Sequence, residues 1–115
     1  MSFADTILVI EDDPSIAALV AYALRQTARA VRRVGNGADA MASAREAPPE
    51  LIILDLGLPD ADGASVCRAL RQETRAPIVV LTARHDERDA VQLLNAGADD
   101  YVTKPFRMSE LIARV

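Results

Sequence analysis

The sequence lacks the features that mark membrane, secreted and disulfide-linked proteins. No apolar run approaches the roughly 18 residues of a membrane span, and the first residues have neither the basic start nor the apolar block of a signal peptide. We therefore expect a cytoplasmic protein with no membrane contact. The single cysteine, Cys67, excludes an internal disulfide, and with only one histidine in the chain it makes a poor metal site. We assign Cys67 to helix packing.

An excess of positive charge is also absent. The formal net charge of −4 argues against a nucleic-acid backbone as a direct ligand, because such binding rests on clustered lysine and arginine. Any contact with DNA must therefore come from another part of a longer protein. At 115 residues, the chain has the size of one ordinary domain and can bury roughly two thirds of its unfolded surface. We expect one domain over residues 1–115.

Short apolar runs alternate with stretches of helical period along the whole chain. This pattern predicts repeated β-α-β units and therefore an α/β fold with a parallel sheet. Runs 51–54 and 78–81 are almost continuously apolar, as strands covered on both faces are, whereas run 30–34 is half polar and suits an edge. The five runs lie at residues 6–10, 30–34, 51–54, 78–81 and 101–103.

Capping and turn residues delimit the predicted helices. Asp13 is the expected N-cap of a first helix that opens at Pro14 and repeats apolar residues at the i, i+3, i+4 spacing. The apolar face of the last helix still repeats at Val115, which predicts that this helix is truncated and that the chain is cut from a longer protein. The later helices are expected between Asn36-Gly37 and Pro48-Pro49, from Asp62-Gly63 to about Glu73, from about Glu87 to Ala96 before Gly97, and from Met108 onward.

Four charged residues that follow these runs predict a single site. Glu11 and Asp12 close the first run, Asp55 closes the third, and Lys104 follows the last. With right-handed crossovers, a sheet of order 2-1-3-4-5 makes the first and third strands neighbours and places its topological switch point between them. Carboxylates gathered at that edge repel one another and need a cation.

Several short motifs along the chain are weak separately and specific in this order. They are Ile10-Glu-Asp-Asp-Pro14, Asp55-Leu-Gly-Leu-Pro59, Asp62-Gly63, Leu81-Thr-Ala83 and Gly97-Ala-Asp-Asp-Tyr-Val-Thr-Lys-Pro-Phe106. With these motifs, the chain resembles the receiver domain of bacterial two-component response regulators, and it is most similar to the OmpR/PhoB subfamily of transcriptional regulators. The resemblance implies a flavodoxin-like (CheY-like) doubly wound fold with five parallel strands and five helices.

This resemblance implies that Asp55 accepts a phosphoryl group from a sensor histidine kinase. It also implies that Asp12 and Asp55 bind Mg²⁺ directly, that Glu11 acts largely through water, and that the backbone carbonyl of Gly57 completes the protein ligands. Such a ligand set agrees with the preference of Mg²⁺ for one or two carboxylates, several waters and phosphate oxygens.

Three further residues receive roles from the same resemblance. Lys104 would pair with a phosphoryl oxygen as a point charge. Thr82 would hydrogen-bond the phosphoryl group, and the ring of Tyr101 would swing inward when the threonine moves. The last two would form a two-state switch that a local change of charge biases.

The face made by residues 86–115, which covers the expected fourth helix, fifth strand and fifth helix, forms symmetric dimers in the OmpR/PhoB subfamily. We expect phosphorylation to promote such a homodimer and a linked winged-helix domain to bind DNA and control transcription. Ala90 stands where that subfamily usually has a lysine, so one ion pair is missing unless Arg88 substitutes. The other charged residues of this face are Asp99, Asp100, Glu110 and Arg114.

Two other functions share parts of this pattern. A stand-alone adaptor of the chemotaxis type would carry every one of these site residues. An aspartyl-phosphate hydrolase also uses an aspartate nucleophile with Mg²⁺, but such enzymes have a second acid two residues beyond the nucleophile, where this chain has Gly57. We therefore expect a regulatory domain whose only chemistry is its own phosphorylation and dephosphorylation.

Overall fold

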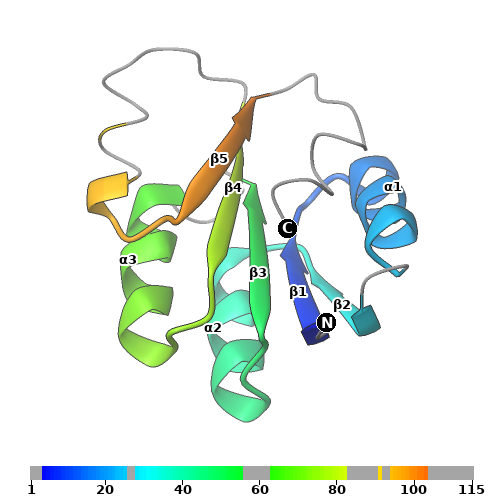
Figure 1. Cartoon of the computed structure of the whole chain (residues 1–115), viewed down its shortest axis with the longest axis horizontal. Helices are drawn as coiled ribbons and strands as arrows, with labels where there is room; N and C mark the ends of the chain where they lie inside the picture. The colour runs from blue at the N-terminus through cyan, green and yellow to red at the C-terminus, as the bar shows by residue number, and fades with distance from the viewer. Residues whose placement is uncertain (1–3, 26–27, 56–62, 83–90, 92–93, 104–115) are drawn as a thin grey trace.

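Five parallel strands form one sheet in the computed structural model, which describes residues 4–25, 28–55, 63–82, 91 and 94–103 (Figure 1). Their order is β2-β1-β3-β4-β5, the order predicted from the sequence. The α/β class is confirmed, and the half-polar strand lies at an edge as expected. The strands are β1 (Ala4–Ile10), β2 (Ala28–Val34), β3 (Leu51–Asp55), β4 (Ile78–Thr82) and β5 (Asp100–Thr103).

Three helices lie in the described residues, and local signals explain their ends. α1 (Pro14–Leu24) starts after Asp13, whose carboxylate accepts hydrogen bonds from the backbone N–H groups of Ser15 and Ile16. α2 (Gly37–Glu46) starts after Asn36, whose side chain accepts from the N–H of Asp39 at 2.8 Å, and it ends two residues before Pro48. α3 spans Gly63–Glu73, the predicted range.

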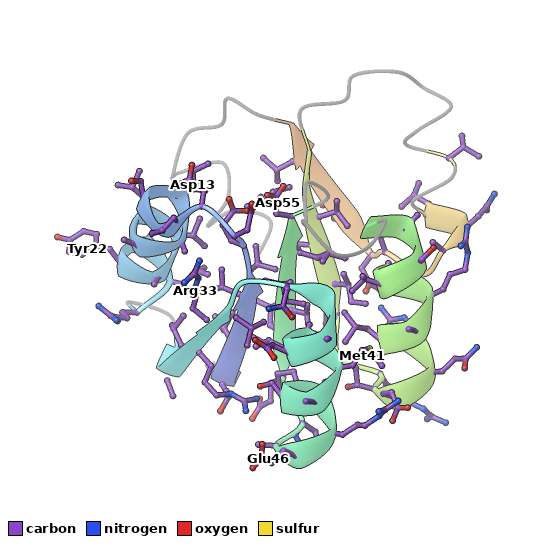
Figure 2. The ribbon with its side chains drawn as sticks, turned by 180° about the vertical axis from the view of Figure 1, so that it is seen from behind. Asp13, Tyr22, Arg33, Met41, Glu46 and Asp55 are labelled. Atoms are coloured by element: carbon purple, nitrogen blue, oxygen red, sulfur yellow. The ribbon has the colours of Figure 1, made fainter. Side chains whose placement is uncertain are left out.

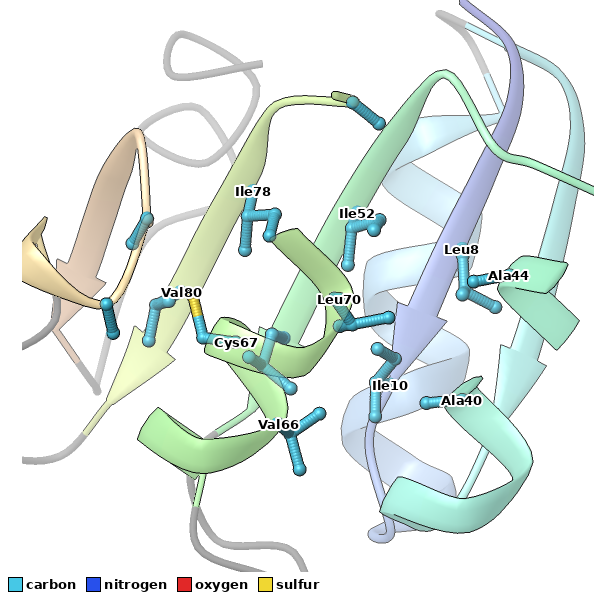
Figure 3. Packing of buried hydrophobic residues seen from close by; sticks show 14 residues of the cluster. Leu8, Ile10, Ala40, Ala44, Ile52, Val66, Cys67, Leu70, Ile78 and Val80 are labelled. Atoms are coloured by element: carbon cyan, nitrogen blue, oxygen red, sulfur yellow. The ribbon is translucent and has the colours of Figure 1, made fainter. Parts of the chain in front are cut away.

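The sheet separates two layers of helix, with α1 on one face and α2 and α3 on the other (Figures 1 and 3). Successive residues of β1 serve the two faces alternately, because side chains of a strand alternate in direction. Leu8 and Ile10 pack in the cluster under α2 and α3, whereas Ile7 and Val9 pack in the cluster under α1. This double covering explains why the central runs are apolar at every position.

Two strands begin two residues earlier than the apolar pattern predicts. β1 starts at Ala4 instead of residue 6, and β2 starts at Ala28 instead of residue 30. The two added segments pair with each other, since Ala4 lies opposite Ala28. Backbone pairing therefore extends both strands through polar positions that hydrophobic periodicity does not detect.

The two remaining predicted helices fall largely outside the described residues. Of the fourth, residues 91, 94 and 95 are helical, and Gly97 follows with a φ of 109°, the left-handed conformation predicted for a helix end. The helix expected from Met108 lies wholly outside them. Within the part of the chain that the structure describes, no helix is both long enough and apolar enough to cross a membrane.

Candidate functional site

The pairing of β1 with β3 brings the predicted acidic residues together. Ile10 lies opposite Leu54 in this parallel pair, so Glu11 and Asp12 leave β1 beside the point where Asp55 ends β3. These strands finish at the same end of the sheet, which we call the carboxyl edge. It is the position at which open α/β sheets bind ligands.

Three carboxylates are crowded at the carboxyl edge. Glu11, Asp12 and Asp55 each offer one oxygen atom, and these atoms lie within 4.8 Å of one another. Glu11 is 1% exposed and Asp55 is 5% exposed, whereas Asp12 is open to solvent. Figure 2 shows Asp55 at the end of its strand. Like charges held this close, and partly removed from water, repel one another more strongly than they would in solution.

The donors of this cluster fit a hard divalent cation. All of them are carboxylate oxygens, which Mg²⁺ and Ca²⁺ prefer, and neither a thiol nor an imidazole belongs to the group. The exposed carboxylate of Asp12 leaves room for water molecules in the coordination sphere, as Mg²⁺ requires. The predicted combination of Glu11, Asp12 and Asp55 is therefore suited to Mg²⁺.

The third acid of the run 11–13 has a structural role. Asp13 caps α1, with its Oδ1 atom 2.8 Å from the backbone nitrogen of Ser15. Its carboxylate is committed to the helix end, as predicted, and is not one of the clustered acids. Three consecutive acidic residues thus divide into two site residues and one structural cap.

An arginine that the sequence analysis did not select lies behind the acidic turn. Arg33 of β2 donates from Nε to the carbonyl oxygen of Glu11 and from Nη2 to that of Asp12, both at 3.0 Å. In the alternation of β2, it falls on the α1 side of the sheet (Figure 2). The half-polar pattern of this strand indicated an edge but not a partner for either arginine.

The backbone positions of the predicted switch residues also lead to the carboxyl edge. Asp55 lies opposite Leu81 in the pairing of β3 with β4, so Thr82 is one residue beyond the partner of Asp55. Tyr101 pairs with Val80 on the neighbouring strand. Five other predicted residues, namely Gly57, Lys104, Arg88, Glu110 and Arg114, lie outside the described residues.

The opposite end of the sheet, where β4 and β5 begin, carries a second charged group. We call it the amino edge. Arg71, in the last turn of α3, donates to the carbonyl oxygens of Gly97 at 2.7 Å and Ala76 at 2.9 Å, and it forms an ion pair with Asp99 at 2.8 Å. The same oxygen of Asp99 accepts from the N–H of Ile78 at 2.8 Å. Asp99, which we predicted to bridge dimers, therefore bonds within its own chain; Asp100 begins β5 opposite Val79.

Cys67 packs in the core under α3, as its assignment to helix packing predicted. Burial raises the pKa of its thiol, while the positive charge of Arg71 acts in the opposite direction. A buried thiol with a raised pKa remains protonated and unreactive at neutral pH.

Comparisons with known proteins identify similar sequences and similar folds. Residues 7–115 match the family model described as the response regulator receiver domain. Over 109 residues, 95% of this chain, the sequence is 48% identical to the DNA-binding response regulator MtrA of Mycolicibacterium smegmatis and 49% identical to the transcriptional regulatory protein KdpE of Mycobacterium tuberculosis. The chain covers 48% of each of these relatives, about half of their length.

The solved structures agree as well. The BeF3-activated N-terminal receiver domain of Klebsiella pneumoniae RstA superposes with a TM-score of 0.87 at 33% identity, over 96% of this chain and 94% of that one.

Proposed function

Because this chain belongs to the response regulator receiver domain family of two-component systems, we propose that Asp55 accepts a phosphoryl group from a sensor histidine kinase. The observation that supports this role most directly is the meeting of Asp55 with Glu11 and Asp12 at adjacent strand ends. A buried aspartate that served only the fold would have no evident reason to lie beside two other acids.

In the proposed reaction, an oxygen of the Asp55 carboxylate attacks the phosphorus atom of a phosphohistidine. A new O–P bond forms an acyl phosphate, and the N–P bond breaks, so that the imidazole leaves with the bonding electron pair. The ionised carboxylate is itself the nucleophile and needs no general base. The fold positions it at the end of a buried strand, where its orientation is restricted.

Glu11, Asp12 and Asp55 would hold Mg²⁺, together with the backbone carbonyl of Gly57. When bound, the cation supplies positive charge that offsets repulsion between the acids and an incoming phosphoryl group. The acids themselves provide the oxygen donors, and Glu11 is buried in the wall of the site.

Lys104 would pair with a phosphoryl oxygen, and Thr82 would hydrogen-bond another, because the strand that Thr82 ends lies beside β3. Movement of Thr82 would then favour an inward position of Tyr101. This pair would pass the state of Asp55 to the face formed by residues 86–115, where phosphorylation would promote a homodimer.

The output we propose is control of transcription. The relatives named above are DNA-binding or transcriptional regulators, and this chain matches about half of their length. A winged-helix domain in the remaining half of the parent protein would bind the DNA. These names favour this output over a stand-alone adaptor and over an aspartyl-phosphate hydrolase.

The phosphoacceptor is tested by labelling with acetyl phosphate or with a phosphorylated sensor kinase. Wild-type protein should incorporate phosphate only when Mg²⁺ is present, and Asp55→Asn should incorporate none. Asp13→Asn is a matched control, because it changes a neighbouring acid that caps a helix and should label normally. Equal labelling of wild type and Asp55→Asn would refute the assignment.

The proposed dimer is tested separately by sedimentation with Mg²⁺ and beryllofluoride, a phosphoryl mimic. The mass should rise toward that of a dimer. An unchanged mass at concentrations well above physiological would leave phosphorylation intact as a function but remove dimerisation as its output.

A further inference from the structure

We infer that Arg33 is a positioning residue for the cation site, which holds the turn carrying Glu11 and Asp12 in the shape that binds Mg²⁺. This inference rests on the proposed function of the acidic cluster. It concerns how this chain prepares the site before a cation arrives, a task that the clustered acids cannot perform for themselves because they repel one another.

The backbone of Glu11 is held on both sides by β2. Its N–H donates to the carbonyl oxygen of Val34 at 3.0 Å, and its own carbonyl oxygen accepts from Arg33 at 3.0 Å. The strand register of β1 with β2 ends at Ile10 and Val34. The guanidinium of Arg33 thus continues the connection between the two strands beyond the last paired residues.

One guanidinium spans two successive peptide groups of the turn. Nε bonds the carbonyl of Glu11, and Nη2 bonds that of Asp12, each at 3.0 Å. Two donors in a rigid plane restrict the relative orientation of these two peptides, and the two carboxylates project from the same residues. Asp13 restrains the other end of the turn by capping α1.

Gly35 lies beside this contact. A Cβ atom at Gly35 would lie 3.5 Å from Nη2 of Arg33 and 3.9 Å from the Cα of Asp12, so the guanidinium lies between the end of β2 and the acidic turn. Arg33 is therefore close enough to the acidic turn to affect it directly.

Two opposite effects of Arg33 on cation affinity can be compared. The positive charge of Arg33 near an anionic site disfavours the binding of a metal cation there. The side chain is exposed, however, so water and salt screen this charge. Its hydrogen bonds to two carbonyls pre-organise the ligands, and loss of such supporting contacts typically weakens metal affinity about 10-fold to 100-fold. We expect positioning to outweigh repulsion, with a smaller effect here because the contact is partly exposed.

The test is Mg²⁺ binding by calorimetry to wild type, Arg33→Gln and Arg33→Lys. We expect both substitutions to raise the dissociation constant about fivefold, because neither side chain can bond both carbonyls in the same way. Repulsion alone predicts the opposite sign for Arg33→Gln, which would bind more tightly, and no change for Arg33→Lys. Arg45→Gln is the matched control; it removes one positive charge from a surface ion pair between α2 and α3 and should bind as wild type does.

A second readout separates positioning from a general loss of fold. In acetyl-phosphate labelling, the Arg33 variants should need about fivefold more Mg²⁺ for half-maximal rate and reach the wild-type rate at saturation. Unchanged or tighter binding by both variants would overturn the inference while leaving the proposed function intact. Failure of wild type to bind Mg²⁺ would overturn the proposed function instead. Should Arg33→Gln fail to fold by circular dichroism, Arg33→Lys alone decides between these outcomes.

Discussion

At the carboxyl edge of the sheet, three carboxylates lie within 4.8 Å of one another, whereas at the amino edge Arg71 and Asp99 form an ion pair of 2.8 Å. Both groups join segments that are distant in sequence. The amino edge combines opposite charges with backbone carbonyls and so contributes to folding stability. The carboxyl edge gathers like charges, which oppose folding and favour a cation. We therefore assign the amino edge to the stability of the fold and the carboxyl edge to the proposed function.

The arginines of the two edges sharpen this contrast. Arg71 bonds an aspartate as well as carbonyls, so its charge is used within the chain. Arg33 lies beside acidic residues but bonds their backbone carbonyls. Its contacts restrict the backbone of the turn. Substitutions of the charged residues at the two edges should therefore change the free energy of unfolding in opposite directions.

The largest expected effect is at Arg71. Arg71→Leu removes the donors to Gly97, Ala76 and Asp99 and should lower the free energy of unfolding by about 3 kcal/mol, since a partly buried arginine and several polar partners lose their bonds. Urea denaturation measures this change. Arg68→Leu, at an exposed position of the same helix, should change stability by less than about 0.5 kcal/mol. Similar losses in both variants would contradict a special role for Arg71.

The next effect is at Gly97. Its φ of 109° is strained for any residue with a side chain, and an added Cβ would lie 3.0 Å from Cγ of Arg71. Gly97→Ala should therefore cost about 2 kcal/mol of stability. Gly35→Ala provides the comparison, because its Cβ would meet its nearest atom at an ordinary 3.5 Å. Thermal denaturation of the pair should show a clear loss for Gly97→Ala alone.

The carboxyl edge should respond in the opposite direction. Without a divalent cation, Asp55→Asn should raise the free energy of unfolding by about 1 to 2 kcal/mol, because one of three crowded like charges is removed. Mg²⁺ at about ten times its dissociation constant should stabilise wild type by about 1.4 kcal/mol and Asp55→Asn by less. Denaturation in EDTA and in Mg²⁺ provides both values. A destabilised Asp55→Asn in EDTA would show that the cluster supports the fold.

The smallest effect concerns pH and the core near the amino edge. Burial raises the pKa of the Cys67 thiol, so the native state keeps the thiol proton at a pH where the unfolded thiol, whose ordinary pKa is 9.0, loses it. The contribution of the protonated thiol is complete below that value and is lost as the pH rises through the folded pKa. Wild type should thus lose more stability than Cys67→Ala between about pH 8 and pH 10. Parallel curves for the two proteins would refute this linkage.

The candidate site was predictable where residues follow strands directly. Asp55 and the pair Glu11 and Asp12 end apolar runs, and the spacing of those runs determines which strands are neighbours. The roles of Lys104 and Gly57 remain predictions. Arg33 and Arg71 were not found, because their bonds to the carbonyls of Glu11 and Gly97 span 22 and 26 residues, and backbone carbonyls leave no trace in residue type.

Asp99 is another residue whose contacts the sequence did not predict. The sequence places it beside Asp100 and suggests one role for both residues, whereas in the structure Asp99 accepts from Arg71 and from the N–H of Ile78. Its contribution to a dimer would have to accommodate these bonds. Adjacent identical residues in a sequence therefore need not share a function.

The amino-acid sequence by itself determined the alternation of strands and helices, the cap at Asp13 and the edge at which acids accumulate, because periodicity, capping and strand direction depend on near neighbours. Only the tertiary structure decided which carbonyls Arg33 and Arg71 bind and that Asp99 pairs with Arg71. The physical reason is that a hydrogen bond of a long side chain depends on where distant backbone groups lie, and the packing of the whole sheet determines those positions.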